Sequence, residues 1–448
     1  MSLPQYPEYK DSGHPHISKV PSQWEIKPLK HCLRLITEKA AGKSSPIALE
    51  NIEGWSARYL PSESDFEGVG IAFRQGDILF GKLRPYLAKV YQAEFAGEAI
   101  GDFHVMRPVA GLIGRYALYQ FLQESFISVV DGATHGAKMP RVGWEFMGNM
   151  PFVVPRPEEQ LQIARFLSHE TAKIDALIRE QERLIELLQE KRQAVISHAV
   201  TKGLDPDVPM KDSGVEWLEE VPAHWRVVPF GYAISYQEGP GIMASDFRDE
   251  GVPLLRVSGV QGRWASLKGC NYLDPKKVKK RWKHFQLNHG DLLISASASM
   301  GTVCEVDNAT VGAVPYTGLI RLTPIAKISH RDFVRAIVGS QQFAVQIDLF
   351  KAGSTIQHFG PTHLSQMKVA LPPLEEQIQL AEHVDKVTTE FKSLIEEAEK
   401  GNKLLKERRT ALISAAVTGK IDVRNWQPPQ DESAFDEEVR KAGMEATA

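Results

Sequence analysis

The sequence is poor in the features that mark secreted, membrane or metal-binding proteins. Its 448 residues include three cysteines, Cys32, Cys270 and Cys304, and no two of them form a CxxC pair. This argues against a cysteine zinc site or a disulfide framework and fits a reducing, cytoplasmic compartment. No apolar run approaches the roughly 20 residues that a membrane helix needs. The first residues also lack the basic and then apolar pattern of a signal peptide, so we expect no secretion.

Basic and acidic residues are also nearly balanced in number. The chain has 53 Lys and Arg against 56 Asp and Glu, a formal charge of -3, so no global basic field indicates a nucleic-acid partner. The charge is nevertheless uneven. Residues 31–150 carry 12 basic and 13 acidic side chains, whereas residues 232–370 carry 16 and 10. The end of the chain, 427–448, is acidic and is predicted to be a mobile tail.

Catalytic motifs are absent too. There is no HExxH and no GxSxG. The AGKSS segment at 41–45 has Thr37 where a P-loop requires glycine, and the NMPF segment at 149–152 has Met150 where the loop of amino-methyltransferases has proline. We interpret NMPF as a strand. The sequence therefore offers no constellation for catalysis, and no metal site is expected.

What the chain does contain is an internal repeat. KDSGHPHISKVPSQWEIKP from Lys10 matches KDSGVEWLEEVPAHWRVVP from Lys211, at an offset of 201. PRPEEQLQIA from Pro155 matches PPLEEQIQLA from Pro372, at an offset of 217 that holds without a gap to Thr201 and Thr418. Over those 47 positions 21 residues are identical, far more than chance gives. GDIL at 76–79 and GDLL at 290–293 form a weaker third pair. The chain therefore consists of two copies of one unit whose bodies have diverged.

Each copy is predicted to end in a long helix. Prolines precede residues 158–200, carboxylates occupy the first turn, and glycines mark the ends of both helices at 203 and 419. Apolar residues recur close to a heptad spacing on a narrow stripe. The stripe contains Ile174, Leu177, Leu184, Leu188 and Val195 in the first helix, and Phe391, Leu394, Ala398, Leu405 and Leu412 in the second. We expect the two helices to pack against each other; the alternative is that each packs on its own body.

The bodies, 30–150 and 231–370, are predicted to be mixed α/β. Short β-type runs lie at 69–73, 77–80, 90–92 and 103–108, and at 254–257, 292–295, 303–306 and 319–322. A helical stretch is expected at 116–130 and at 331–350. In the second body six basic residues crowd 276–283 with Trp282 and Phe285 among them, a run that can contact several phosphates. The alternative is a solvated surface turn.

Together these features resemble the specificity subunits of type I restriction–modification systems. The resemblance rests on the duplicated P-x-x-EEQ helix starts, the helix ends ISHAVTKG and ISAAVTGK, the KDSG lead-ins and the GDIL and GDLL strands, and it covers about residues 8–426. It implies an α+β fold: two target recognition domains, 1–154 and 206–371, joined by two long antiparallel conserved helical spacers, 155–205 and 372–426, with a pseudo-two-fold repeat.

The resemblance also implies a function. Each recognition domain would read one half of a bipartite, asymmetric target in double-stranded DNA, and the helices would fix the gap between the half-sites. Two modification (methyltransferase) subunits and the restriction (translocase and endonuclease) subunits would be the partners. S-adenosylmethionine, ATP and Mg²⁺ would be bound by those partners, with no cofactor and no catalysis in this chain.

Candidate residues follow from residue type and place, because base edges and phosphates are contacted best by basic, amide and hydroxyl groups. For DNA contact we predict Lys82, Arg84, Lys138 and Arg141 in the first body, and Lys279, Lys280, Arg281, Ser295, Ser297, Gln357 and His358 in the second. For the spacer helices and their partners we predict Glu158, Glu159, Gln160, Leu177, Leu188, Glu375, Glu376, Gln377, Leu394 and Leu405.

Two other functions stay open at this point. One is a DNA adenine methyltransferase or fused restriction enzyme with its own catalytic centre, which the missing motifs argue against. The other is a coiled-coil scaffold without a DNA function, which a gel shift with the co-purified methyltransferase subunit would distinguish.

Overall fold

The computed structural model describes residues 4–40, 45–61, 68–136, 138–296, 303–351 and 359–428; the acidic tail predicted at 427–448 therefore lies almost wholly outside the described residues. The chain divides into two compact units, residues 1–183 with 399–448, and residues 184–398. Each unit combines sheets with helices, which confirms the predicted α+β class. Among the described helices none is both long and apolar enough to cross a membrane.

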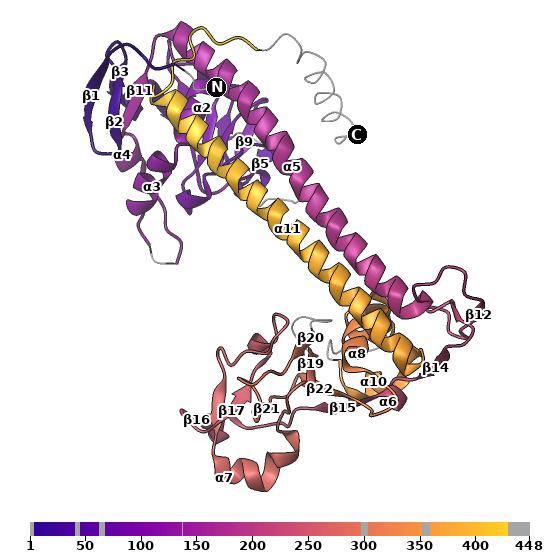
Figure 1. The fold of residues 1–448 in the computed structure, drawn as a ribbon. Coiled ribbons are helices and arrows are strands. Elements are labelled where there is room, and N and C mark those ends of the chain that lie inside the picture. The colour runs from indigo at the N-terminus through magenta and orange to yellow at the C-terminus, as the bar shows by residue number, and fades with distance from the viewer. Residues whose placement is uncertain are drawn as a thin grey trace. The chain divides into compact units, whose positions relative to one another are not determined.

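The body of the first unit, indigo to purple in Figure 1, is built on an antiparallel four-stranded sheet; its strand order is β4-β10-β7-β8. Its strands are β4 Leu33–Ile36, β7 Ile78–Gly81, β8 Val90–Gln92 and β10 Phe103–Pro108. One side of this sheet is covered by α2 Gly114–Phe121 and α3 Glu124–Gly132, with Phe80, Phe121 and Phe126 in mutual ring contact. A three-stranded sheet packs on the other side and consists of β5 Pro46–Ile47, β6 Ile71–Phe73 and β9 Gly97–Ala99.

The second unit repeats this arrangement. Its four-stranded sheet has the order β15-β22-β19-β20, which is the same topology. The strands are β15 Ile234–Glu238, β19 Leu292–Ser295, β20 Val303–Glu305 and β22 Leu319–Pro324, and the covering helices are α8 Arg331–Val338 and α9 Gln341–Lys351. The additional sheet differs, because it has four strands here: β16 Phe247–Arg248, β17 Val252–Leu255, β18 Asn271–Leu273 and β21 Val314–Pro315. The two bodies therefore diverge most in this additional sheet.

Smaller elements are duplicated too. They are the hairpins β1 Tyr9–His14 with β2 Ile17–Pro21 and β12 Met210–Asp212 with β13 Glu220–Pro222; the pairs β3 Glu25–Pro28 with β11 Pro151–Val154 and β14 Arg226–Pro229 with β23 Lys368–Leu371; and the short helices α1 Leu29–Cys32, α4 Trp144–Met147, α6 Phe230–Ala233 and α10 Pro361–Gln366. Strand β11 confirms the interpretation of NMPF as a strand leading into the long helix.

The repeated Gly-Asp pair has the same structural role in both bodies. Gly76 and Gly290 have φ values of +89° and +83°, a conformation that glycine adopts without strain. The carboxylate of the following Asp77 accepts a hydrogen bond from the Arg74 backbone N–H and pairs with Arg107 on β10 at 2.7 Å. Asp291 accepts from the Asn288 N–H in the same way, and Arg321 on β22 lies 3.9 Å away. The motif therefore joins a turn to the neighbouring strand.

The expected helix at 158–200 is confirmed as α5 Pro157–Lys202, and its repeat is α11 Leu374–Val417. The glutamine of each EEQ motif fixes the helix start to its body. The fully buried amide of Gln160 accepts from the Ile113 N–H at 2.8 Å and donates to the carbonyls of Gly111 and Pro155. Gln377 repeats all three bonds with His330, Ile328 and Pro372.

Both helices end against a lead-in. Gly419 follows α11 with a φ of +74°, and a Cβ there would lie 2.4 Å from Pro21 and 3.0 Å from the Trp24 ring. Gly203 follows α5 with a φ of +81°, beside Trp225. Both tryptophans are fully buried. Glycine is therefore required at each helix end for its backbone conformation, and at Gly419 for the close approach as well.

Within the first unit α5 and α11 run antiparallel, because Asp175 pairs with Arg409 while Glu182, further along α5, pairs with Lys406. The apolar stripe differs from the predicted one by a residue in places. Leu177 is 53% exposed, and in the second unit Leu394 is 49% exposed while the adjacent Ile395 is buried. The residues at 402 and 409, Asn402 and Arg409, also lie on the buried face. The apolar pattern therefore placed Leu177, Leu394 and also Leu184, which is 43% exposed, on the wrong side.

The helical stretches predicted at 116–130 and 331–350 are each two helices rather than one. Leu122 and Gln123 separate α2 from α3, and Gly339 and Ser340 separate α8 from α9. In the second unit the Ser340 hydroxyl accepts a hydrogen bond from the Phe343 N–H and so caps the start of the new helix. Both sequences contain enough apolar residues to continue one helix, which is why periodicity did not show the break.

Candidate nucleic-acid interface

Two loops of the first unit lie side by side and bring the four predicted basic residues together. The Val142 N–H donates to the Lys82 carbonyl at 3.0 Å, and the Arg84 N–H donates to the Pro140 carbonyl at 2.9 Å. The second loop is itself a narrow hairpin, since His135 and Arg141 exchange two backbone hydrogen bonds. Lys138 lies within this hairpin and is exposed. The predicted residues of the two loops, 54 to 59 positions apart in the sequence, therefore share one surface.

A carboxylate organises this basic surface. Asp102, at the start of β10, accepts two hydrogen bonds from the Arg141 guanidinium at 2.8 and 2.9 Å, and the Lys82 ammonium lies 3.8 Å away. The hydrogen bond from Arg141 holds the pKa of Asp102 below its usual value, against the opposing effect of burial. Asp102 therefore stays ionised and fixes the direction of the Arg141 side chain. The sequence pattern did not suggest Asp102 because it lies far from both loops along the chain.

The turn after Arg84 presents apolar side chains beside the basic ones. Arg84 and Ala88 have φ values of +50° and +45° and bracket a 3-10 turn at Pro85–Leu87. Tyr86 is 49% exposed, and Met139 in the neighbouring loop is 47% exposed. Exposed aromatic and aliphatic side chains among basic groups are suited to contact with base edges and thymine methyl groups. Tyr86 and Met139 are not among the residues that the sequence predicted for DNA contact.

In the second unit the described residues that flank the equivalent loops are hydrogen-bonded to each other. The Phe359 N–H donates to the Ala296 carbonyl at 3.3 Å, and these positions match Val142 and Lys82 in the repeat. Ser295 lies at the end of β19 and is 3% exposed. The other three residues predicted here, Ser297, Gln357 and His358, lie outside the described residues. The meeting point of the two loops is thus present in both bodies.

The basic run of the second unit is a compact helical segment. It comprises α7 Pro275–Lys277, a π-helical turn at Val278–Trp282 and a 3-10 turn at Lys283–Phe285. Val278 and Trp282 are 2% and 7% exposed and pack in a small core with Leu254 and Leu273. The residues between these two anchors, Lys279, Lys280 and Arg281, are exposed. Burial of the anchors therefore turns three consecutive cations toward solvent.

The comparison with known proteins starts with this second unit. Residues 236–404 match the family described as Type I restriction modification DNA specificity domain. The chain is also 23% identical over 439 residues to the type I restriction enzyme MjaVIII specificity subunit of Methanocaldococcus jannaschii. The aligned residues cover 92% of this chain and 96% of that protein. Residues 236–404 therefore match this family, and the chain as a whole is similar to type I restriction enzyme specificity subunits.

Further similarities agree with this family. The chain is 22% identical over 224 residues to the EcoKI specificity subunit of Escherichia coli, which covers 47% of this chain and 46% of that one. A solved chain described as "Structural basis underlying complex assembly and conformational transition of the type I R-M system" matches with a TM-score of 0.70 at 16% identity, over 90% of this chain and 99% of that chain. At this identity the likeness concerns the fold alone.

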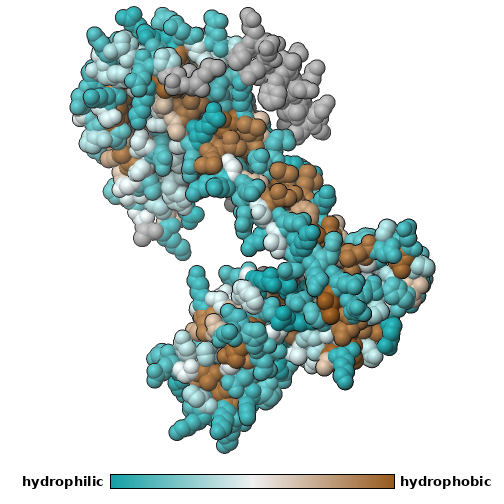
Figure 2. All heavy atoms as spheres, in the orientation of Figure 1, coloured by the Kyte–Doolittle hydropathy of each residue, from teal (hydrophilic) through white to brown (hydrophobic). Residues whose placement is uncertain are grey.

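The predicted residues of the two long helices fall into two groups. Some hold the helix starts in place: Glu159 accepts from the Tyr6 hydroxyl at 2.6 Å, and Glu376 accepts from His224 and Trp225. Others reach the surface or come close to it. The exposed ones are Glu158, Glu375, Leu177 and Leu394, and the half-buried ones are Leu188 and Leu405. Figure 2 shows hydrophobic patches between hydrophilic side chains along the long helices.

Replacing Asp102 with asparagine tests the electrostatics of the basic surface. The variant removes a negative charge from it and the bidentate partner of Arg141. Non-specific DNA affinity should rise, and the slope of log affinity against log salt should steepen by about 1, because one more cation can engage phosphate. Sequence discrimination should fall, because Arg141 is no longer held. Fluorescence anisotropy over a salt series measures both. Glu94→Gln, at an exposed carboxylate in the turn after β8, is the matched control; an equal effect there would contradict a local role for Asp102.

Proposed function

We propose that this chain is the DNA-recognition subunit of a type I restriction–modification complex, in which each body reads one half of a bipartite target. The observation that carries the proposal is the repeated pair of adjoining loops, tied by Val142 to Lys82 in one body and by Phe359 to Ala296 in the other. The match of residues 236–404 to the DNA specificity domain family and the similarity of the whole chain to specificity subunits support it. Two different bodies on one repeated frame suit an asymmetric target, because each can contact a different base sequence.

The residues have different proposed roles. In the first body Arg141, whose direction Asp102 fixes, and Arg84 in its rigid turn are placed to read base edges, since a positioned guanidinium recognises guanine well. Lys82 and Lys138 are assigned to phosphates. In the second body Lys279, Lys280 and Arg281 are assigned to phosphates, and Ser297, Gln357 and His358 remain predictions for base contact. Ser295 is not assigned a contact, because its side chain is buried. Phosphate contacts supply affinity, whereas base contacts supply specificity.

The long helices are proposed to set the distance between half-sites and to bind partners. Half-sites read from one side of DNA are separated by about one helical turn, ~34 Å, so a spacer of constant length is required. The exposed leucines along α5 and α11 are candidate contacts for two modification subunits. S-adenosylmethionine would be bound by those subunits, and ATP and Mg²⁺ by the restriction subunits, while this chain contributes recognition and no chemical step.

The experiment that tests this function is the purification of the chain with its methyltransferase subunit, followed by mapping of N6-methyladenine in DNA exposed to the complex. We expect one bipartite sequence with a gap of fixed length. Methylation by the chain alone would favour the fused-enzyme alternative, and the absence of sequence-selective binding by the complex would favour a scaffold. A chimera in which residues 231–370 come from another specificity subunit should change one half of the methylated sequence and leave the other half intact.

A further inference from the structure

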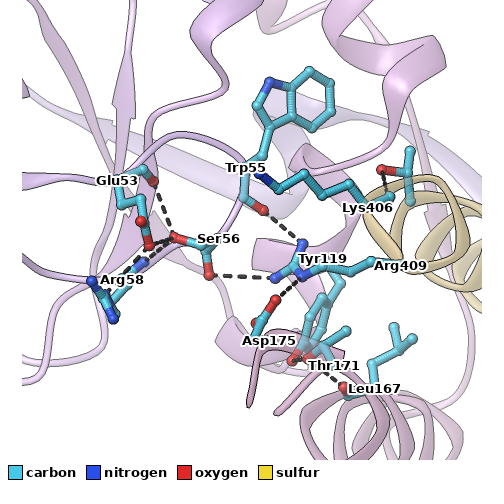
Figure 3. A network of polar contacts seen from close by, with 11 residues as sticks. Glu53, Trp55, Ser56, Arg58, Tyr119, Leu167, Thr171, Asp175, Lys406 and Arg409 are labelled. Carbon is cyan, nitrogen blue, oxygen red and sulfur yellow. Dashed lines mark hydrogen bonds and ion pairs between the residues drawn. The ribbon is translucent and has the colours of Figure 1, made fainter. Parts of the chain in front are cut away.

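The first unit contains an ion pair between a buried arginine and a half-buried aspartate, and it joins the two long helices to a loop of the body (Figure 3). The Arg409 side chain, on α11, is 9% exposed. Its Nε donates to the Asp175 carboxylate on α5 at 2.7 Å, and its Nη1 donates to the Trp55 carbonyl at 2.7 Å. The Ser56 carbonyl lies 3.5 Å from Nη2. One guanidinium therefore binds α5 and the loop at the same time.

Because Arg409 is buried, replacing either partner of this ion pair is costly. Loss of solvent raises the pKa of Asp175, although Arg409 favours its ionised form. A buried charge that loses its partner is strongly destabilised, so neither member is readily replaced by an ordinary polar residue. The geometry is also specific, because a lysine in place of Arg409 has one nitrogen and cannot span the carboxylate and the carbonyl as the planar guanidinium does.

The loop that Arg409 holds has an uncommon backbone. Trp55 and Ala57 have φ values of +66° and +62°, a region that side chains other than glycine rarely adopt and that costs about 1 kcal/mol or more for each residue. The Ser56 hydroxyl is bonded to the Glu53 carboxylate at 2.6 Å, which closes the turn on its other side. The hydrogen bonds from Arg409 to the carbonyls of the loop help to maintain this conformation.

The same loop supports the turn that carries Arg84. The Trp55 N–H donates to the Ala88 carbonyl at 3.0 Å. A Cβ at Gly54 would lie 2.3 Å from the Leu87 carbonyl oxygen, so the two backbones are in direct contact. Ala88 and Leu87 end the turn that begins at Arg84. A continuous path of contacts thus runs from the helix pair, through residues 54–56, to the basic surface.

The second half of the chain lacks this arrangement. Arg192 occupies the position of Arg409 in the repeat, but the position of Asp175 is occupied by Lys392, whose side chain is 70% exposed. The buried Nε of Arg192 has no hydrogen-bond partner within the described residues. Both halves of the repeat therefore have the arginine, but only the first half has the aspartate with which the arginine forms an ion pair.

We infer that Arg409 is a positioning residue for DNA reading by the first body. By fixing residues 54–56 against both helices, Arg409 sets the place of the turn at 84–88 and hence of the Arg84 side chain. This inference rests on the proposed function. It predicts that the loss of the link lowers discrimination at one half-site and leaves the other half-site unaffected.

The test uses the complex of the full chain with its methyltransferase subunit. Selection from randomised DNA with the wild-type complex defines the two half-sites, and the half-site whose preference changes in Arg84→Ala is assigned to the first body. Arg409→Lys, Asp175→Asn and the matched control Arg192→Lys are then compared by competition with DNA carrying single-base changes in each half-site. Thermal unfolding of each complex is measured in parallel.

Arg409→Lys and Asp175→Asn should lower discrimination at the first half-site about tenfold, the order of one base contact, with the second half-site unchanged. Arg192→Lys should leave the first half-site unchanged. Equal losses at both half-sites, unchanged discrimination, or a lower melting temperature with intact discrimination would each overturn the inference. If the wild-type complex itself shows no sequence selectivity, it is the proposed function that fails.

Discussion

Replacing Lys279, Lys280 and Arg281 together with alanine should lower DNA affinity by at least two orders of magnitude at about 0.1 M salt. Each phosphate contact contributes about 0.9 to the slope of log affinity against log salt, so three lost contacts should reduce that slope by about 2.7. Val278 and Trp282 stay in place in this variant, so the helical segment keeps its core. The three side chains are exposed, and their loss should change stability little.

The measurement is a salt series of DNA affinities for the wild-type and variant complexes, with both half-sites present. The control variant replaces Lys392, Lys400 and Lys403 on α11 with alanine, which removes the same charge from another exposed surface. A similar fall in slope for both triple variants would mean that only the overall charge matters. No change in the first variant would show that the basic run is a solvated surface segment.

The single variants Gln160→Leu and Gln377→Leu should each lower the free energy of unfolding of the unit that contains the replaced residue by about 3 kcal/mol. Both glutamines are fully buried, and each satisfies one backbone N–H and two carbonyls. Leucine fills a comparable space and leaves those groups without partners, at about 1 to 3 kcal/mol for a buried group that loses its hydrogen bond. Because the two sites share no partners, their effects in the double variant should add.

Chemical denaturation followed by tryptophan fluorescence and far-ultraviolet circular dichroism measures these losses. Trp24 and Trp225 are buried, one in each unit, and each reports on the transition of its own unit in a variant in which it is the only one of the eight tryptophans left. Gln189→Leu, at an exposed position of α5, serves as the control and should stay within about 0.5 kcal/mol of the wild type. If the free energy of unfolding of Gln160→Leu is lower than that of the wild type by less than about 1 kcal/mol, water must satisfy the backbone groups in place of the glutamine amide.

The repeat let the sequence predict most of the frame. Strands β8, β10 and β19 have the predicted bounds, and the two long helices begin and end within two or three residues of expectation. These features are local: they depend on alternation, on helical spacing and on turn residues such as Gly76 and Gly290. The pairing of the two loops in each body was not predicted, although both loops were selected, because it depends on a fold that brings residues 82 and 142 together.

Residues that act over a long separation were missed for the same physical reason. Asp102 and Arg409 are polar, and their partners lie 39 and 234 positions away. Nothing in their neighbourhood along the chain marks them. The helix stripe failed at Leu177 for a related cause, since the stripe was defined by apolar side chains and the folded protein places Arg409 on the buried face instead.

The division of the long helices between the units also has a consequence for synthesis. The core of the first unit includes Ile413, Ala416 and Val417 from the end of α11, and the Asp422 N–H bonds the Pro4 carbonyl. The second unit, residues 184–398, is continuous in sequence. On the ribosome the last residue of the second unit, 398, is therefore made before Ile413, Val417 and Val423, which the core of the first unit needs. This reverses the usual order in which the N-terminal unit folds first.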